Sequence, residues 1–94
     1  MNKFINKIEL QGVVGRANTN ERYTDFSLLT ERTFTDVLGG SVVDCNWFEC
    51  RTTNQRVEKG MWVHIIGWVN VFQYESDGIT HKHWRIIVEN IEIL

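Results

Sequence analysis

Apolar and polar residues alternate along most of this chain, and the alternation predicts β-strands. Five runs of this kind cover residues 7–15, 23–30, 42–53, 61–74 and 81–94. The runs are rich in valine, isoleucine, threonine and aromatic residues, which fit a pleated, half-buried surface. The chain contains no proline, the residue that would confine a run to the edge of a sheet.

Short turn signals containing glycine separate the later runs. They are Gly39-Gly40, Lys59-Gly60 and Ser76-Asp77-Gly78. An Asp-Gly pair between two strand-like runs predicts a tight hairpin, because both residues tolerate positive φ. Gly12 lies inside the first run, where a glycine indicates a bulge or a sharp bend.

Five strands with glycine bends and little helix predict an all-β fold, a five-stranded Greek-key barrel of the OB-fold type. A β-sandwich would need about seven strands, which this length barely accommodates. Only residues 54–59 leave room for a turn of helix. Because there is no linker or low-complexity tract, residues 1–94 are expected to form one domain.

The large aromatic residues of the fourth run fall on the face that also carries polar side chains. Strand side chains alternate between two faces, and the set expected inside the barrel is Met61, Val63, Ile65, Val69 and Val71. The opposite set contains Trp62, Trp68, Phe72 and Tyr74. Exposed aromatic rows indicate an interface or a ligand surface. At Trp62 and Trp68 a subunit boundary is as well supported as a ligand surface, whereas at Phe72 and Tyr74 a ligand surface is favoured.

In the third run Trp47 shares a face with Glu49 and Arg51, and the opposite face carries Phe48 and Cys50. The second pair is expected in the core. A tryptophan beside an arginine is typical of proteins that bind single strands, because the ring stacks on a base while the cation contacts phosphate. The alternative for Trp47 is structural, with one edge packed and the other in water.

Charge and motifs narrow the functional classes. The net charge is −2, unusual for a nucleic-acid binder, although binding depends on where charges lie rather than on their sum. The chain has no nucleophile–base signature, no phosphate-cradling glycine loop and no close carboxylate pair. We therefore expect a binding protein without catalysis and without a cofactor.

A metal site is not expected either. Cys45 and Cys50 are five residues apart, so on one strand their side chains point to opposite faces. His81 and His83 share a face but lack a third ligand in register. There is no apolar run long enough to span a membrane and no recognisable signal peptide. The sequence thus predicts a cytoplasmic protein with reduced thiols and no membrane partner.

Ordered segments along the chain resemble one family. They are residues 6–15, the pattern Cys-Asn-Trp-Phe-Glu-Cys at 45–50, Lys-Gly and its following strand at 59–67, residues 74–78, and residues 88–94. In this order they resemble the bacterial single-stranded DNA-binding proteins, which are OB-fold proteins. The resemblance spans nearly the whole chain. It implies that Phe34, Trp47 and Tyr74 stack on bases, Phe34 lying in a short loop-like stretch at residues 33–36.

A curved groove over the second to fourth strands is the binding site that we predict, with Phe72 as a further aromatic contact. The cations expected on phosphates are Arg16, Arg22, Arg32, Arg51, Arg56 and Lys82. The partner is single-stranded DNA, bound without sequence preference in replication, repair or recombination. The chain departs from the family in having fewer cations in the fourth strand and almost no helix after the third.

The resemblance also implies assembly into a homo-oligomer, either a dimer or a tetramer. We expect no acidic C-terminal recruitment tail, since the sequence ends at Leu94. Primosomal replication protein N, a tail-less relative, is an alternative. Two other functions also remain open, a protein-interaction OB domain acting through its aromatic face and an oligosaccharide-binding module.

Overall fold

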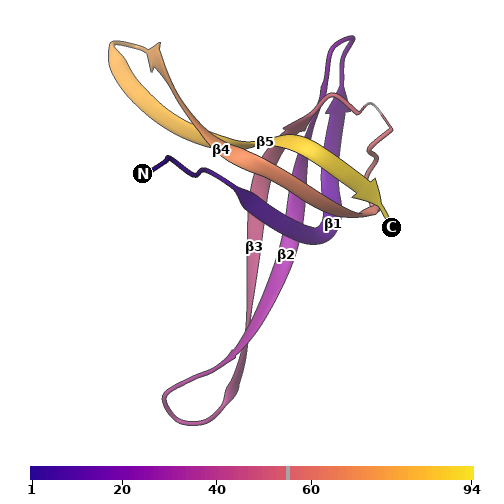
Figure 1. The fold of residues 1–94 in the computed structure, drawn as a ribbon, viewed down its shortest axis with the longest axis vertical. Helices are drawn as coiled ribbons and strands as arrows, with labels where there is room; N and C mark the ends of the chain where they lie inside the picture. The colour runs from indigo at the N-terminus through magenta and orange to yellow at the C-terminus, as the bar shows by residue number, and fades with distance from the viewer. Residues whose placement is uncertain (55) are drawn as a thin grey trace.

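The computed structural model describes residues 1–54 and 56–94 and contains the five predicted strands (Figure 1). They are β1 (Ile8–Thr19), β2 (Thr24–Thr35), β3 (Ser41–Thr52), β4 (Trp62–Ser76) and β5 (Ile79–Ile93). The part of the chain that the structure describes contains no helix, so the turn of helix considered for residues 54–59 is absent from residues 54 and 56–59. No helix long and apolar enough to cross a membrane occurs in these residues.

The strands close into a barrel in the order β1-β2-β3-β5-β4. Neighbouring strands are antiparallel except β3 and β5, which pair in parallel through Cys50 with Ile86 and Arg51 with Ile87. This closed five-stranded topology confirms the predicted OB-fold. All strand bounds except the ends of β1 and β2 lie within two residues of those read from the alternation, whereas β1 and β2 continue four and five residues beyond the predicted ends at 15 and 30.

β1 bends because it serves two neighbours. Its first half pairs with β4 and its second half with β2, and Val13 pairs with both Trp62 and Leu29. A Cβ atom at Gly12 would collide with the backbone oxygen of Leu29, so only glycine fits where the strand turns. The bend predicted at Gly12 is thus confirmed, while the register shift lies slightly further on, between Val14 and Arg16.

The core fills the barrel where all five strands meet. It consists of Val14, Phe26, Leu28, Cys50, Val57, Val63, Ile65, Ile86 and Val88. Cys50 is buried and Phe48 packs against the cluster, as predicted for that face of the third run. The expectation that Val71 lies inside is wrong, because its side chain is 63% exposed. β4 has left the barrel at this point and continues as one arm of a hairpin.

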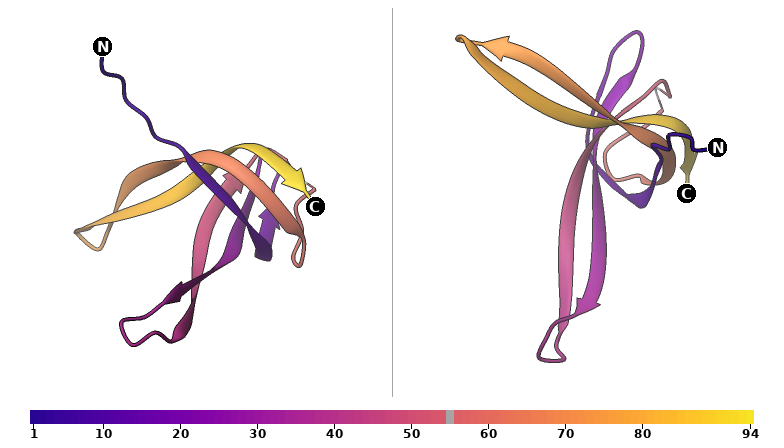
Figure 2. Two further views of the ribbon diagram at one scale, coloured as in Figure 1. Left: turned by 60° about the horizontal axis from the view of Figure 1, so that its bottom comes forward. Right: turned by 60° about the vertical axis from the view of Figure 1, so that its left-hand side comes forward.

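Two long hairpins project from the barrel (Figure 2). The β2–β3 ladder continues to Thr35 opposite Ser41, so the loop predicted at residues 33–36 is wrong for residues 33–35, which belong to β2. The β4–β5 ladder continues to Ser76 opposite Ile79. Its two-residue turn has φ of 54° at Asp77 and 76° at Gly78, the positive pair of the predicted tight hairpin. The arms carry most of the exposed aromatic side chains discussed below.

Candidate nucleic-acid interface

Trp47 lies on the outer face of β3 and is 59% exposed. Its indole reaches across β2 and covers Gly15 of β1, where a Cβ atom would overlap the ring. The ring forms one wall of a shallow hollow lined by Gly15, Arg16, Ser27, Trp47 and Glu49. A large flat side chain is therefore supported by the sheet from beneath and open to solvent, as a stacking platform requires.

Arg16 stands at the edge of this platform. Its Nη2 atom lies 3.3 Å from Oε1 of Glu49, and both side chains are mostly exposed. Ion pairs of this kind contribute roughly 0–1 kcal/mol, because water screens them and long side chains must be ordered. Arg16 can therefore exchange Glu49 for a phosphate group at little cost.

Arg51, on the same face of β3, is held much more firmly. Its Nε and Nη2 atoms donate to the two carboxylate oxygens of Asp25 at 2.7 and 3.0 Å. The guanidinium also lies over the Tyr23 ring, 3.7 Å from its centroid. The hydrogen bonds to Asp25 raise the pKa of Arg51 above its ordinary value. Its paired donors are already used, so the predicted contact of Arg51 with phosphate would require breaking this bidentate pair.

The β4–β5 hairpin carries a series of rings on one face. Tyr74 lies between two histidines, with centroid distances of 5.1 Å to His81 and 5.2 Å to His83. The Tyr74 hydroxyl lies 3.1 Å from Nε2 of His83, within hydrogen-bond distance. Phe72 is stacked with His83 at 6.0 Å. Tyr74 remains 45% exposed, so part of its ring is open to solvent between the two histidines.

Arg85 closes the inner end of the ring series and was not predicted from the sequence. Its guanidinium carbon lies 4.1 Å from the centroid of Phe72, a cation–π contact. The Nε atom is buried and has no hydrogen-bond partner among the described residues. The alternation that placed His81 and His83 on one face also places Arg85 there, and this was the available signal. The stacking on Phe72 holds the guanidinium in place without neutralising it.

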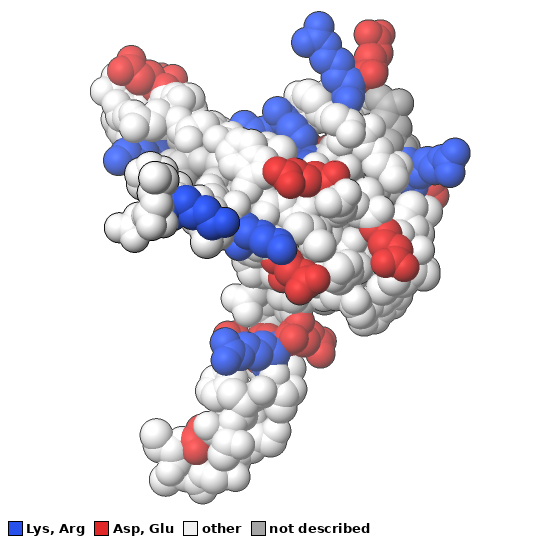
Figure 3. All heavy atoms as spheres, in the orientation of Figure 1, with Lys and Arg blue, Asp and Glu red and all other residues white. Residues whose placement is uncertain are grey.

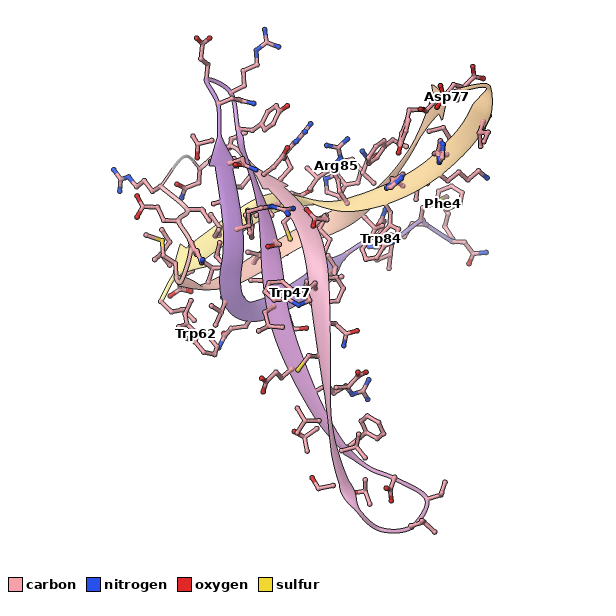
Figure 4. The ribbon with its side chains drawn as sticks, turned by 180° about the vertical axis from the view of Figure 1, so that it is seen from behind. Phe4, Trp47, Trp62, Asp77, Trp84 and Arg85 are labelled. Atoms are coloured by element: carbon pink, nitrogen blue, oxygen red, sulfur yellow. The ribbon has the colours of Figure 1, made fainter. Side chains whose placement is uncertain are left out.

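A groove joins the two regions. A hollow of about 280 Å³ lies between β1, β3 and the base of the β4–β5 hairpin. It is lined by Arg16, Asn18, Asp25, Glu49, Cys50, Phe72, His83, Trp84 and Arg85. Arg16 and Glu49 also line the hollow beside Trp47. In Figure 4, Trp84 and Arg85 lie on opposite sides of the β4–β5 ribbon where it leaves the barrel, and Trp47 lies on the neighbouring strand β3. The Trp47 platform and the rings of the β4–β5 hairpin are thus connected through the groove. We call this surface, from Trp47 past Arg16 and Arg85 to Phe72, His83 and Tyr74, the track.

Several solved structures share this arrangement of strands. SSB from Plasmodium falciparum in complex with ssDNA superposes with a TM-score of 0.83 at 21% identity, covering 100% of this chain and 99% of that one. A deletion mutant of the Thermus aquaticus single-stranded DNA binding protein gives 0.83 and 21%, with 96% of this chain spanning half of that chain. The small protein of this kind from Streptomyces coelicolor gives 0.65 and 17%, covering 99% and 95%.

The chain has the fold of single-stranded DNA-binding proteins. Neither a protein-family model nor the sequence of a curated protein matches it. At these identities the likeness establishes the fold, and the residues of the site must be judged from their own geometry. On that basis the structure brings Arg16, Trp47, Phe72 and Tyr74 together out of the predicted set.

The other site residues that were predicted from the sequence lie apart from the track. Phe34 is exposed near the end of the β2–β3 arm, and the register places it on the opposite face of the ladder from Trp47. Arg32 shares that opposite face. Lys82 is on β5, where the register places it opposite Gln73 and on the other face from Tyr74.

Two predicted cations occupy turns at one end of the barrel. Arg22 lies in the turn between β1 and β2, where its backbone N–H donates to Oδ1 of Asn20. Arg56 follows β3 and its backbone N–H donates to Oδ1 of Asn54. In Figure 3, lysine and arginine are scattered among acidic residues on the visible face rather than gathered into one basic patch. In the groove itself two cations, Arg16 and Arg85, are matched by two carboxylates, Asp25 and Glu49, so positive charge is not concentrated along the track.

Trp84 was also missed by the sequence interpretation. It packs edge-on against Phe48, with the centroids 6.1 Å apart, and half of its surface remains exposed beside Arg85.

The two cysteines differ in their chemistry. Burial, together with the charge of Glu49, raises the pKa of the Cys50 thiol to about 12, whereas Cys45 is exposed. Within residues 1–54 and 56–94, no three His, Cys, Asp or Glu side chains form a metal-binding group.

Proposed function

We propose that this protein binds single-stranded DNA without sequence preference, and that it serves DNA replication, repair or recombination without catalysing a reaction. The observation that carries the proposal is the exposed indole of Trp47 seated on Gly15, at the head of a groove that leads to the rings of the β4–β5 hairpin. The solved complex of one protein of the same fold with ssDNA supports it.

Stacking supplies most of the affinity in this proposal. Each base stacked on an aromatic ring contributes about 1–3 kcal/mol regardless of its sequence. Trp47 offers an open ring face for this purpose, Tyr74 offers a partly exposed ring flanked by His81 and His83, and Phe72 adds an apolar edge inside the groove. Duplex DNA would bind poorly, because its bases are already stacked on one another and cannot reach the rings.

Phosphate contacts supply a smaller part. Arg16 and Arg85 line the groove, and neither is tied by a bidentate ion pair. With few free cations along the track, few counterions are released when DNA binds, so affinity should fall only gently as salt rises. The other predicted cations, Arg22, Arg32, Arg51, Arg56 and Lys82, could contact a longer strand that leaves the track. We also propose that the protein is homo-oligomeric and cytoplasmic.

Titration of a fluorescent oligothymidine into the wild-type chain and into the Trp47→Ala and Tyr74→Ala variants tests this function. Each substitution should weaken binding about 5- to 150-fold, while light scattering reports an unchanged mass. Trp47→Phe is the matched control and should retain most of the affinity. A wild type that fails to bind at low salt shows that the proposal is wrong. If the substitutions alter the mass instead of the affinity, the proposal is also wrong, and the aromatic face serves protein association.

A further inference from the structure

A second tryptophan stands in register with Trp47 across the outside of the barrel. Trp47 of β3 pairs directly with Leu29 of β2, Leu29 pairs with Val13 of β1, and Val13 pairs with Trp62 of β4. Directly paired residues of adjacent strands project from the same face of a sheet. An apolar row therefore crosses four strands, with an exposed indole at each end.

Trp62 forms a wall of its own hollow. This concavity measures about 350 Å³ and is lined by Gln11, Gly12, Val13, Leu29, Thr30, Glu31 and Trp62. That volume falls at the lower end of the range of small-ligand sites, about 300–1,000 Å³. Trp62 is 56% exposed, so its ring is available to whatever enters. The floor of the hollow is the same Val13–Leu29 pair that connects the two tryptophans.

The two indoles are close enough to share one ligand strand. Neighbouring strands are spaced about 4.8 Å apart, so three intervals separate the Trp47 and Trp62 backbones by about 14 Å. The Trp47 ring shortens this gap, because it leans across β2 onto Gly15 of β1. Figure 4 shows the two residues on either side of the bend of β1.

The backbone beneath Trp62 is fixed on both sides. The N–H of Leu94 donates to the carbonyl of Trp62 at 2.9 Å, and the N–H of Val14 donates to the carbonyl of Met61 at 2.9 Å. A ring held on a rigid backbone loses little entropy when a base stacks on it. Trp62 therefore shares with Trp47 an exposed ring, and its backbone is held in place by the neighbouring strands.

We propose that Trp62 is a second base-stacking platform and that a bound single strand continues from Trp47 over Leu29 and Val13 into the hollow beside Trp62. This inference rests on the proposed function. The occupant of the hollow is an unpaired base and not a phosphate, because the carboxylate of Glu31 lies in the lining and repels the backbone. Gln11 and Thr30 offer polar groups to the edge of the base.

A comparison of oligonucleotide lengths tests the platform. OB-folds cover about 4–16 nucleotides, so oligothymidines of about 6 and about 16 nucleotides are titrated into wild type, Trp62→Ala and Trp62→Phe. Trp62→Ala should bind the short oligonucleotide like the wild type and lose about 5- to 150-fold in affinity for the long one. Trp62→Phe should restore most of that loss, and light scattering should show one mass for all three proteins.

The outcomes separate this inference from the proposed function. Equal affinity of Trp62→Ala and wild type for the long oligonucleotide, or a change of mass in Trp62→Ala, overturns the second platform. In the second case the face joins copies of the chain. A wild type that binds neither oligonucleotide overturns the proposed function itself. If Trp62→Ala does not fold, the indole N–H resonance of Trp62 in the wild type decides, because the long oligonucleotide alone should shift it.

Discussion

The indole of Trp47 lies directly over Gly15, two strands away, in the space that any larger side chain at position 15 would occupy. Gly15 is not among the glycines with positive φ, so its backbone conformation is open to other residues. What requires glycine here is the ring above it. The smallest residue on β1 and one of the largest on β3 thus form one unit, in which the sheet backbone supports the stacking surface.

Gly15→Val should displace this ring. The barrel should stay folded, because the conflict is with a partly exposed side chain that can rotate away, but binding of oligothymidine should fall about tenfold. The same substitution in a Trp47→Ala background should have little further effect, since the ring that it displaces is already gone. This double-mutant cycle isolates the pair. Additive losses in the cycle would show that Gly15 acts independently of Trp47.

Arg85 and Lys82 provide a matched pair of cations on β5. Arg85 lies over Phe72 in the groove, whereas Lys82 is on the other face from Tyr74. Arg85→Ala should reduce the slope of log affinity against log salt by about 0.7, the value for one phosphate of a single strand. Lys82→Ala makes the same change in net charge and should leave the slope nearly unchanged. Equal changes would mean that only the total charge matters.

The Asp77-Gly78 turn fixes the hairpin that carries Tyr74. Gly78→Ala places a Cβ atom on a residue with φ of 76°, which costs about 1–2 kcal/mol. Amide hydrogen exchange should therefore become about 5- to 30-fold faster along the outer hairpin, while the core strands keep their protection. Asp77→Asn is the control, because asparagine tolerates positive φ. Uniform acceleration through the barrel would show that the arm is not an independent unit.

The two thiols should react very differently. Cys45 is exposed, whereas Cys50 is buried with its pKa raised to about 12, so almost none of it is thiolate at pH 8. A disulfide reagent should label one thiol per native chain and two per chain in denaturant. Cys45→Ser should abolish the fast reaction. Rapid labelling of native Cys45→Ser would contradict the burial of Cys50.

The sequence by itself determined the number of strands, the Asp77-Gly78 hairpin and the two faces of β3. These features depend on local chemistry, namely the period-two alternation of side chains and the few residues that accept positive φ. Trp47 outside and Cys50 inside follow directly from that alternation. The same reasoning failed for Val71 and for the stretch around Phe34, because alternation does not reveal where a strand leaves the barrel.

Only the tertiary structure decided which side chains act together. Arg16 and Arg51 look equivalent in the sequence. In the structure, however, Arg51 donates two short hydrogen bonds to the carboxylate of Asp25, whereas Arg16 has only a longer, exposed contact with Glu49. Gly15 beneath Trp47, Arg85 over Phe72 and the row from Trp47 to Trp62 all join different strands. Strand pairing fixes such neighbours, and pairing depends on register and closure of the barrel, which no local pattern encodes.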